Sequence, residues 1–241
     1  MNFYALIIGT EILNGRRHDK HFEFVKSELA KYGHELFASF IIKDDVELIK
    51  NSFEFIKNDK NSIMFSFGGI GSTPDDLTRE ISADVFTNEG LVRDKKFEQD
   101  ILEKFGDEAY PHRIRMSDLP KGSDLLFNPV NNMSGYSLEN RFFFVPGFPQ
   151  MAHPMISSVI QKHFSISQKK FRFTLLANTS ENTLNSLMHD VPKDIELSSL
   201  PMFIDSKPSV ELSLSGYDKV KVEYYFNIFK EELKSKDISF T

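Results

Sequence analysis

Short apolar runs alternate with amphipathic helical patterns along the first part of this chain, and this alternation restricts the fold more than any other feature. Apolar runs typical of buried strands cover Asn2–Ile8, Glu35–Ile42 and Ser62–Phe67. Between the first two, Asp19–Tyr32 carries apolar residues at spacings of three and four, and a glycine follows it. Such strand–helix–strand units form right-handed crossovers and parallel sheets. We therefore predict an α/β fold, with a mainly parallel sheet flanked by helices.

The same reading extends to about residue 164. Helices are expected where Val46, Ile49, Phe53 and Ile56 share one face, where Leu77, Ile81 and Val85 do so, and over Asp94–Phe105. Strands are expected over Leu125–Pro129 and Tyr136–Val145, as a hairpin-like excursion, and a rigid turn, Pro146–Pro149, then leads into a helix that ends near Phe164.

A polar stretch without apolar periodicity, Ser165–Lys170, is interpreted as a linker. It divides the chain into an α/β domain, 1–167, and a small C-terminal α+β domain, 168–241. A module of this size is near the lower limit for independent folding, so we expect it to pack on the main domain or on a second subunit, in a homo-oligomer such as a dimer or trimer. Its expected elements are strand Phe171–Ala177, helix Ser180–Val191, strands Met202–Ile204 and Ser209–Ser215, and helix Val220–Leu233.

Composition excludes several classes of protein. There is no cysteine, which rules out disulfides, cysteine-ligated zinc, iron–sulfur clusters and a thiol nucleophile. The net charge of −6 argues against a dedicated nucleic-acid binder. The N-terminus lacks a basic signal-like region and no apolar run is long enough for a membrane span, so no membrane association and a cytoplasmic location are expected.

Residues suited to chemistry concentrate in the loops that follow the predicted strands. These loops are Gly9–Glu11, Asp44–Asp45, Gly68–Asp76 and Pro146–Pro149, whereas the opposite connections are plain polar spacers. In a parallel sheet, the carboxyl ends of the strands meet at one edge, where ligands bind. The sequence therefore predicts one site at that edge.

The loop Gly68–Asp76 carries the sharpest signal. Its glycines permit positive φ and close approach of backbone N–H groups to a ligand, and the helix that follows favours an anion at its N-terminus. Ser72 and Thr73 add hydroxyl donors. The structural alternative is a tight turn in which Thr73 caps the helix and Asp76 completes a capping box, and both interpretations stay open here.

Carboxylates accompany this loop. Asp75 and Asp76 beside a bound phosphate would require a counter-charge, which a divalent cation supplies most simply. Helix capping explains the same residues without a metal, and Asp44 with Glu47 shows the same ambiguity.

Two basic clusters could bind the anionic end of a ligand, although a solvated surface is the more common role for any single residue of this kind. They are Gly15–His21 and Pro111–Arg115. Within the first, His18, Asp19 and His21 are a weak candidate for a metal cluster, because they do not share one helix face. No Ser–His–Asp arrangement can be identified by spacing.

Taken in order, these motifs resemble the molybdopterin-binding domain of the CinA (competence/damage-inducible) family and, more distantly, the molybdopterin adenylyltransferases. The resemblance covers about residues 1–165, and the tail after Ser167 resembles the small domain that follows in CinA proteins. The sequence ends before the amidase domain that some members carry, so we expect that domain to be missing. The residues that carry the resemblance are Gly9–Gly15, Asp44, Gly68–Thr78, Asn128–Pro129, Gly135 and Pro146–Pro149.

The resemblance implies the chemistry of the site. It favours a nucleotide pyrophosphatase of the ADP-ribose type that requires Mg, Mn or Co; the alternatives are a molybdopterin adenylyltransferase-like role, with molybdopterin as ligand, and non-catalytic binding of a pterin or nucleotide. Asp44 and Asp76 are implied as catalytic residues. Glu11, Asp44, Asp75 and Asp76 are the implied metal ligands, and the implied phosphate-binding residues are Gly9, Thr10, Gly68, Gly69, Gly71, Ser72, Thr73, Pro146 and Gly147.

Three positions depart from the usual family pattern. Arg16–His21 replaces an Asn-rich segment, Lys43 stands where a Gly is common, and Ser72 stands where a Pro is frequent. The glycine loop itself is intact. The altered segment is what keeps the non-catalytic alternative open.

Overall fold

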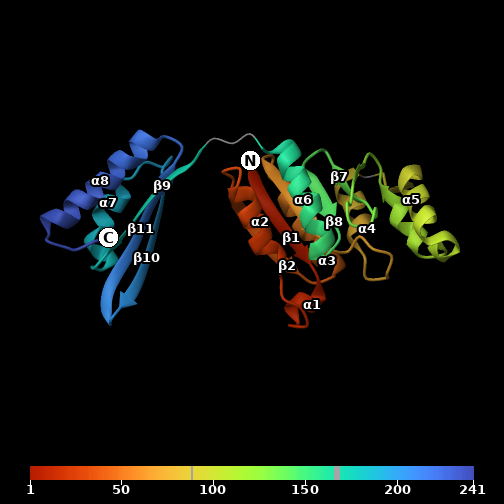
Figure 1. The fold of residues 1–241 in the computed structure, drawn as a ribbon, viewed down its shortest axis with the longest axis horizontal. Helices are drawn as coiled ribbons and strands as arrows, with labels where there is room; N and C mark the ends of the chain where they lie inside the picture. Colours follow the sequence, from red (N-terminus) through yellow and green to blue (C-terminus); the bar gives the residue numbers. More distant parts are fainter. Residues whose placement is uncertain (88, 166–168) are drawn as a thin grey trace. The chain divides into compact units, whose positions relative to one another are not determined.

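The computed structural model describes residues 1–87, 89–165 and 169–241 and divides the chain into two compact units, Met1–Ile166 and Ser167–Thr241 (Figure 1). Each unit has its own hydrophobic core. The boundary expected between residues 167 and 168 lies outside the described residues.

A six-stranded sheet forms the centre of the first unit, in the order β2-β1-β3-β8-β7-β6. β1 pairs in parallel with β2 and β3, and β3 pairs in parallel with β8, whereas β7 is antiparallel to both of its neighbours. The predicted mainly parallel sheet is therefore confirmed. The strands are β1 (Asn2–Ile8), β2 (Leu36–Ile42), β3 (Ser62–Phe67), β6 (Asp124–Leu126), β7 (Gly135–Leu138) and β8 (Phe142–Val145).

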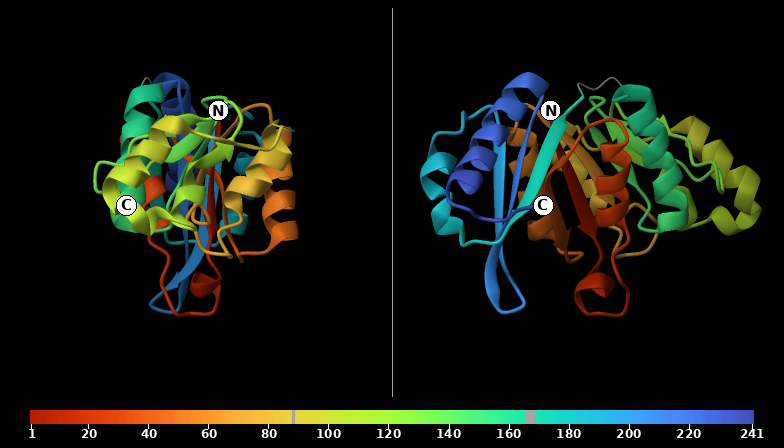
Figure 2. Two further views of the ribbon diagram at one scale, coloured as in Figure 1. Left: turned by 90° about the vertical axis from the view of Figure 1, so that its right-hand side faces the viewer. Right: turned by 60° about the vertical axis from the view of Figure 1, so that its left-hand side comes forward.

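Helices cover both faces of this sheet because its central strands are apolar on both sides. Along β1, Phe3 and Ile7 join one core while Tyr4 and Leu6 join the other. The left view of Figure 2 shows α3, in orange, and α6, in teal, on opposite sides of the strands. One layer holds α2 (His21–Ala30) and α6 (Pro149–His163); the other holds α3 (Val46–Asn58), α4 (Thr78–Ser82) and α5 (Lys95–Phe105).

Several short elements were not expected from the sequence. A π-helix, Ala83–Thr87, continues α4, and the remaining ones flank the carboxyl ends of the strands or surround α5. They are α1 (Thr10–Leu13), β4 (Leu91–Arg93), β5 (Asp118–Pro120) and the 3-10 helices Gly106–Ala109 and Arg113–Ser117.

Two predicted elements are each divided into two in the structure. Tyr136–Val145 is not one strand: a turn with positive φ at Glu139 (55°) and Asn140 (50°) separates β7 from β8. Asn tolerates this left-handed conformation better than most residues, which makes such a turn accessible. In the second unit, the helix expected over Ser180–Val191 is split into a 3-10 helix and a short α7 (Asn185–His189).

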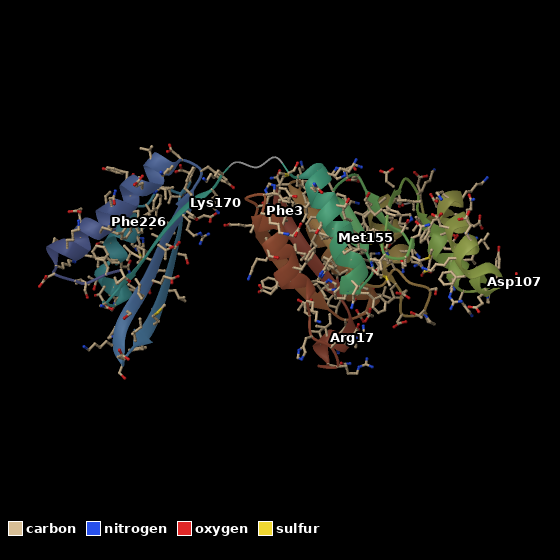
Figure 3. All side chains as sticks on the ribbon, viewed as in Figure 1. Phe3, Arg17, Asp107, Met155, Lys170 and Phe226 are labelled. Atoms are coloured by element: carbon tan, nitrogen blue, oxygen red, sulfur yellow. The ribbon has the colours of Figure 1, made fainter. Side chains whose placement is uncertain are left out.

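The second unit is a three-stranded antiparallel sheet, in the order β10-β11-β9, that packs against α8. Phe226 of α8, labelled in Figure 3, lies in this core with Leu175 and Leu212. The strand expected over Met202–Ile204 begins six residues earlier, at Glu196. The elements are β9 (Phe171–Ala177), β10 (Glu196–Ile204), β11 (Lys207–Gly216) and α8 (Lys219–Ser235).

Within the described ranges, none of the helices combines the length and the apolar character that crossing a bilayer requires.

Candidate functional site

A cavity of about 480 Å³ lies beyond the carboxyl ends of β1, β2, β3 and β8. It is lined by residues from the loops that follow all four strands, so the structure brings together most of the residues singled out in the sequence. Gly9 and Thr10 do not line it directly. The predicted site residues that do are Glu11, Asp44, Gly68, Gly69, Gly71, Ser72, Thr73, Asp75, Asp76, Pro146 and Gly147.

The glycine loop leaves β3 in a conformation that only glycine fits. Gly68 and Gly69 have φ of 101° and 69°. A Cβ on Gly68 would lie 2.3 Å from the carbonyl oxygen of Ile8, and one on Gly69 would lie 2.3 Å from Oγ1 of Thr78. Close packing of the loop on β1 and α4 therefore requires both glycines, quite apart from any ligand.

Asp76 holds the loop in shape. Its Oδ1 accepts from the N–H of Gly71 (2.8 Å), and its Oδ2 accepts from the N–H (2.8 Å) and hydroxyl (2.6 Å) of Thr73. A Cβ on Gly71 would lie 2.5 Å from Asp76 Oδ2, so Gly71 makes room for this carboxylate. The structural alternative in which Thr73 caps the helix is wrong, because α4 begins only at Thr78 and Leu77 occupies the cap position.

Backbone donors for a ligand remain after these bonds are counted. The N–H of Gly68 donates to the carbonyl of Val145 (3.0 Å). Among the described residues, those of Gly69, Ile70 and Ser72 have no recorded acceptor. Unpaired N–H groups on a glycine loop are the usual donors to a phosphate oxygen.

Asp44 ties the loop after β2 to the loop after β1. Its Oδ2 accepts from both the N–H and the hydroxyl of Thr10, each at 2.8 Å. The neighbouring Asp45 caps α3 instead, by accepting from the N–H of Leu48 at 2.9 Å. The capping role considered for Asp44 is therefore wrong, and its carboxylate belongs to the cavity.

Two arginines from the basic clusters also line the cavity. The guanidinium of Arg17 lies 5.7 Å from the ring centre of Phe148, and that of Arg113 lies 4.6 Å from the ring centre of Phe105. Arg17 also lies 3.9 Å from a carboxylate oxygen of Glu11. Figure 3 shows Arg17 at the end of the sheet where α1 lies. The structure thus places one arginine of each cluster at this cavity.

The histidines of the first cluster do not form a metal site with Asp19 among the described residues. Asp19 accepts from the N–H of His21 at 2.8 Å, and the His21 ring stacks on Phe67 with centres 4.3 Å apart. Nε2 of His21 lies 3.3 Å from the carbonyl oxygen of Gly147. Burial lowers the pKa of His21, so a neutral ring donates to this carbonyl and supports the Pro146–Gly147 segment.

Behind His21, the ring of His153 stacks on Phe24 with a centroid distance of 3.8 Å. Burial, with a further contribution from nearby His21, lowers the pKa of His153 from 6.5 to about 4. Its Nε2 is buried and has no hydrogen-bond partner within residues 1–87, 89–165 and 169–241. Both imidazoles are therefore neutral parts of the packing near neutral pH.

Apolar side chains form a further part of the cavity lining, the apolar wall. Sequence reasoning missed it, because its residues come from α5, a 3-10 helix, an irregular loop and the start of α6 and carry no shared pattern. The one available signal was Asn128: its buried side chain donates to the carbonyl of Met133 (3.0 Å) and accepts from the N–H of Val130 (3.1 Å), which shapes the loop. The wall consists of Phe97, Phe105, Met116, Met133, Phe148 and Met151.

A second, wider cleft of about 930 Å³ adjoins the cavity. It shares Ser72, Thr73, Asp76 and Arg113 with the cavity and lies on the side of the loop that faces residues 108–115. Arg79 lines this cleft and not the cavity.

The implied metal ligands share the cavity but are not arranged as a ready-made set. Glu11, Asp44, Asp75 and Asp76 all line it, yet no three acidic or histidine side chains of the described residues are close enough to hold an ion together. Asp76 is engaged by the loop, whereas Oδ1 of Asp44 accepts no hydrogen bond from a described residue. Asp75 is exposed, and the neighbouring Thr73 side chain lowers the pKa of its carboxyl. Asp44 and Asp75 are therefore the carboxylates available to a cation.

Comparison with known proteins gives one consistent result. The model of the family described as "Probable molybdopterin binding domain" matches residues 4–165. A relative from Clostridium kluyveri, named as a competence-damage inducible protein, is 30% identical over 66% of this chain and 40% of its own length. A protein from Archaeoglobus fulgidus is 26% identical over 98% of this chain and 100% of its own length. The crystal structure of a CinA protein of unknown function from Thermoplasma acidophilum has a TM-score of 0.60 at 26% identity, and the match covers 67% of this chain and 96% of that one. The chain thus spans about two fifths of the Clostridium relative.

Proposed function

Because this chain belongs to the probable molybdopterin binding domain family and is a CinA-like member of it, we propose that it is a nucleotide pyrophosphatase of the ADP-ribose type that depends on a divalent metal. The observation that carries the proposal is the composition of the cavity. The cavity is lined by a loop with unpaired N–H donors, by two available carboxylates and by the apolar wall.

The cavity suits a ligand with a phosphate end and a flat ring. Its volume of about 480 Å³ falls in the range of small-molecule sites. Phe105 and Phe148, each with an arginine against its ring, offer surfaces on which a nucleobase or a pterin would stack. The N–H donors of the glycine loop would then bind the phosphates.

The donor set also fits a hard divalent cation. Mg²⁺ is commonly held by one or two carboxylates together with water and ligand phosphate oxygens, so Asp75 suffices as the protein ligand and Oδ1 of Asp44 stays free to accept a proton; Mn or Co would meet the same oxygen donors. When bound, the ion would neutralise charge on the phosphates and polarise the phosphorus that is attacked.

Asp44 is the proposed general base. Its Oδ1 would take a proton from water as the water oxygen bonds to phosphorus, and the bond from that phosphorus to the bridging oxygen breaks, so the second phosphate departs. Thr10 fixes the orientation of the Asp44 carboxylate through Oδ2. The donors of the glycine loop would stabilise the phosphate oxygens throughout.

A second candidate is a role like that of the molybdopterin adenylyltransferases. The observation that favours it is the apolar wall together with the family description, since a pterin needs the same stacking surface as a nucleobase. Binding without turnover is the remaining alternative.

One panel separates these functions. The purified chain is incubated with ADP-ribose, FAD, or ATP plus molybdopterin, each with Mg, Mn or Co and each with a chelator, and the products are identified by mass spectrometry. We expect AMP and ribose phosphate from ADP-ribose only when metal is present. Full turnover in the chelator would contradict the metal requirement, and adenylylated molybdopterin would favour the transferase.

A matched pair of variants tests Asp44. Asp44→Asn keeps an oxygen for Thr10 and removes the charge, and a lost general base lowers kcat by about 10²- to 10⁴-fold. Asp45→Asn removes the adjacent charge, and Asn is itself a good cap for α3. We expect the second variant to turn over like the unmodified protein. Equal activities in the two variants would remove Asp44 from the mechanism.

A further inference from the structure

Arg79 lies buried behind the glycine loop. It is only 7% exposed and sits in the first turn of α4, where its Nη1 donates to the main-chain carbonyls of both Ile70 and Gly71. Its Nε is buried, and no atom of the described residues forms a hydrogen bond with it. Two carbonyls of the loop are therefore turned toward one guanidinium.

The charge of Arg79 has no direct counter-ion. No acidic group of the described residues forms an ion pair with it, although Asp76 and Glu80 are near enough to favour its charged form. Tyr136 is also close, but burial raises the pKa of its phenol, so it is neutral. Arginine keeps its proton even where burial lowers its pKa, and a buried charge of this kind is costly unless something pairs with it.

The carbonyl contacts also determine where the loop donors point. The peptide bonds after Ile70 and Gly71 are trans, so each N–H points opposite to the carbonyl of its own peptide. The N–H of Gly71 reaches Asp76, as described, and that of Ser72 is directed away from Arg79. Ser72 lines the cavity, from which Arg79 is absent, as well as the cleft that Arg79 lines. Arg79 thus aims an unpaired donor at the ligand side of the loop.

We propose that Arg79 is the positioning residue of this loop and its fixed positive charge: it draws two carbonyls inward so that the N–H of Ser72 faces a phosphate of the ligand. The inference rests on the proposed phosphorylated ligand but not on its hydrolysis. It also gives the site a permanent cation that does not depend on bound metal. A phosphate bound to the loop would in turn supply the negative counter-charge that Arg79 does not obtain from the described residues.

The test compares ligands that differ only in phosphate. AMP, adenosine and inorganic pyrophosphate are titrated calorimetrically, in chelator, into the unmodified chain, Arg79→Met and Arg79→Lys. We expect Arg79→Met to weaken the binding of AMP and of pyrophosphate by about tenfold or more and to leave the affinity for adenosine unchanged. Arg79→Lys should fall between, because an ammonium keeps the charge but cannot hold both carbonyls in the same planar fork.

Arg141 supplies the matched control. It also donates to two main-chain carbonyls, those of Ser62 and Asp59, at 3.1 and 3.0 Å, and it does not line the cavity. Arg141→Met should therefore leave all three affinities unchanged. A general loss of structure would weaken adenosine as well as AMP, so the ratio of the two affinities separates positioning from folding.

Three results would overturn the inference. The first is that the ratio of the AMP affinity to the adenosine affinity is the same in Arg79→Met and the unmodified chain. The second is that Arg79→Lys binds pyrophosphate as tightly as the unmodified chain does. The third is that the unmodified chain binds AMP no more tightly than adenosine. If Arg79→Met does not fold, the lysine variant alone decides. An Arg79-dependent preference for phosphate without any hydrolysis of ADP-ribose would instead support this inference and remove the pyrophosphatase.

Discussion

Replacing Asp76 by Asn tests whether this carboxylate serves the loop or the chemistry. Both of its oxygens act as acceptors, one for Gly71 and the other for Thr73. An amide NH₂ cannot accept, so in either orientation one main-chain N–H loses its partner. The Thr73 side is exposed, and its hydroxyl can rotate to accept from the amide, whereas Gly71 is partly buried. The amide nitrogen should therefore face Thr73, where water replaces the lost acceptor.

The expected cost follows from that orientation. One hydrogen bond exchanged for water costs about 1 kcal/mol, whereas Asp76→Ala loses all three and costs about 3 kcal/mol. At about 2–4 °C per kcal/mol, the melting temperature should fall by roughly 2–4 °C in the first variant and roughly 6–12 °C in the second. Turnover of ADP-ribose in Asp76→Asn should stay within about tenfold of the unmodified chain, because the loop keeps most of its bonds.

The assay is thermal unfolding by circular dichroism, measured on the same preparations as the hydrolysis of ADP-ribose. Asp45→Asn is the reference, since it removes a neighbouring charge and preserves a cap. An unchanged melting temperature together with complete loss of turnover in Asp76→Asn would refute the reasoning. It would return Asp76 to the catalytic and metal-binding role that the sequence implied.

Three further outcomes are expected. The pKa of His153 in the folded protein, about 4, lies below its usual 6.5, so the neutral ring contributes stability above pH 6.5 that is lost as the pH falls toward 4. His153→Phe keeps the stacking on Phe24 but cannot be protonated. In urea titrations, this variant should therefore lose less stability between pH 6.5 and pH 4 than the unmodified chain. Thr10→Val removes the hydroxyl that orients Asp44 and should lower kcat by about tenfold with little change in KM, and an unchanged kcat would show that the backbone bond suffices. A fragment of residues 1–167 contains both cores of the first unit and should hydrolyse ADP-ribose normally but differ from the full chain in oligomeric state, as measured by analytical ultracentrifugation; an identical oligomeric state would show that the second unit plays no part in assembly.

The sequence predicts the bounds of three strands to the residue. Asn2–Ile8, Ser62–Phe67 and Phe171–Ala177 coincide with β1, β3 and β9. Each is a continuous or alternating apolar run bounded by residues that break strands, and burial of one or both faces leaves little freedom in register. The mainly parallel order follows from the helices between them.

Prediction fails where a local feature has two structural uses. The spacing of Thr73 and Asp76 fits a capping box, but Asp76 N–H bonds to the carbonyl of Thr73 and closes a turn, and the helix starts later. The pattern of Asp44 and Glu47 fits a cap equally well, and Asp45 takes that role instead. Spacing alone cannot distinguish these, because both options satisfy the same backbone donors.

For the site, the loops could be predicted from the sequence, whereas the apolar wall could not. The loops share one edge by topology, which periodicity reveals, whereas Phe105, Met133 and Met151 approach the cavity only through tertiary packing of irregular segments. Arg79 was missed for a related reason: arginine in the first turn of a short helix is ordinary on a surface, and only the fold shows that this one is buried.

The position of β8 in the sheet has a consequence for how the chain reaches this structure. β8, residues Phe142–Val145, is inserted between β3 and β7, and its side chains complete the cores on both faces. Its parallel partner β3 is made about 80 residues earlier, as in the pairing of Met64 with Phe142. During synthesis, β1, β2 and β3 are therefore made before β8, which leaves the edge of β3 unpaired and both apolar faces of the sheet partly uncovered. The pairing of strands that lie this far apart in the sequence is slow. A nascent chain that stalls before residue 142 would be the form of this protein most in need of a chaperone.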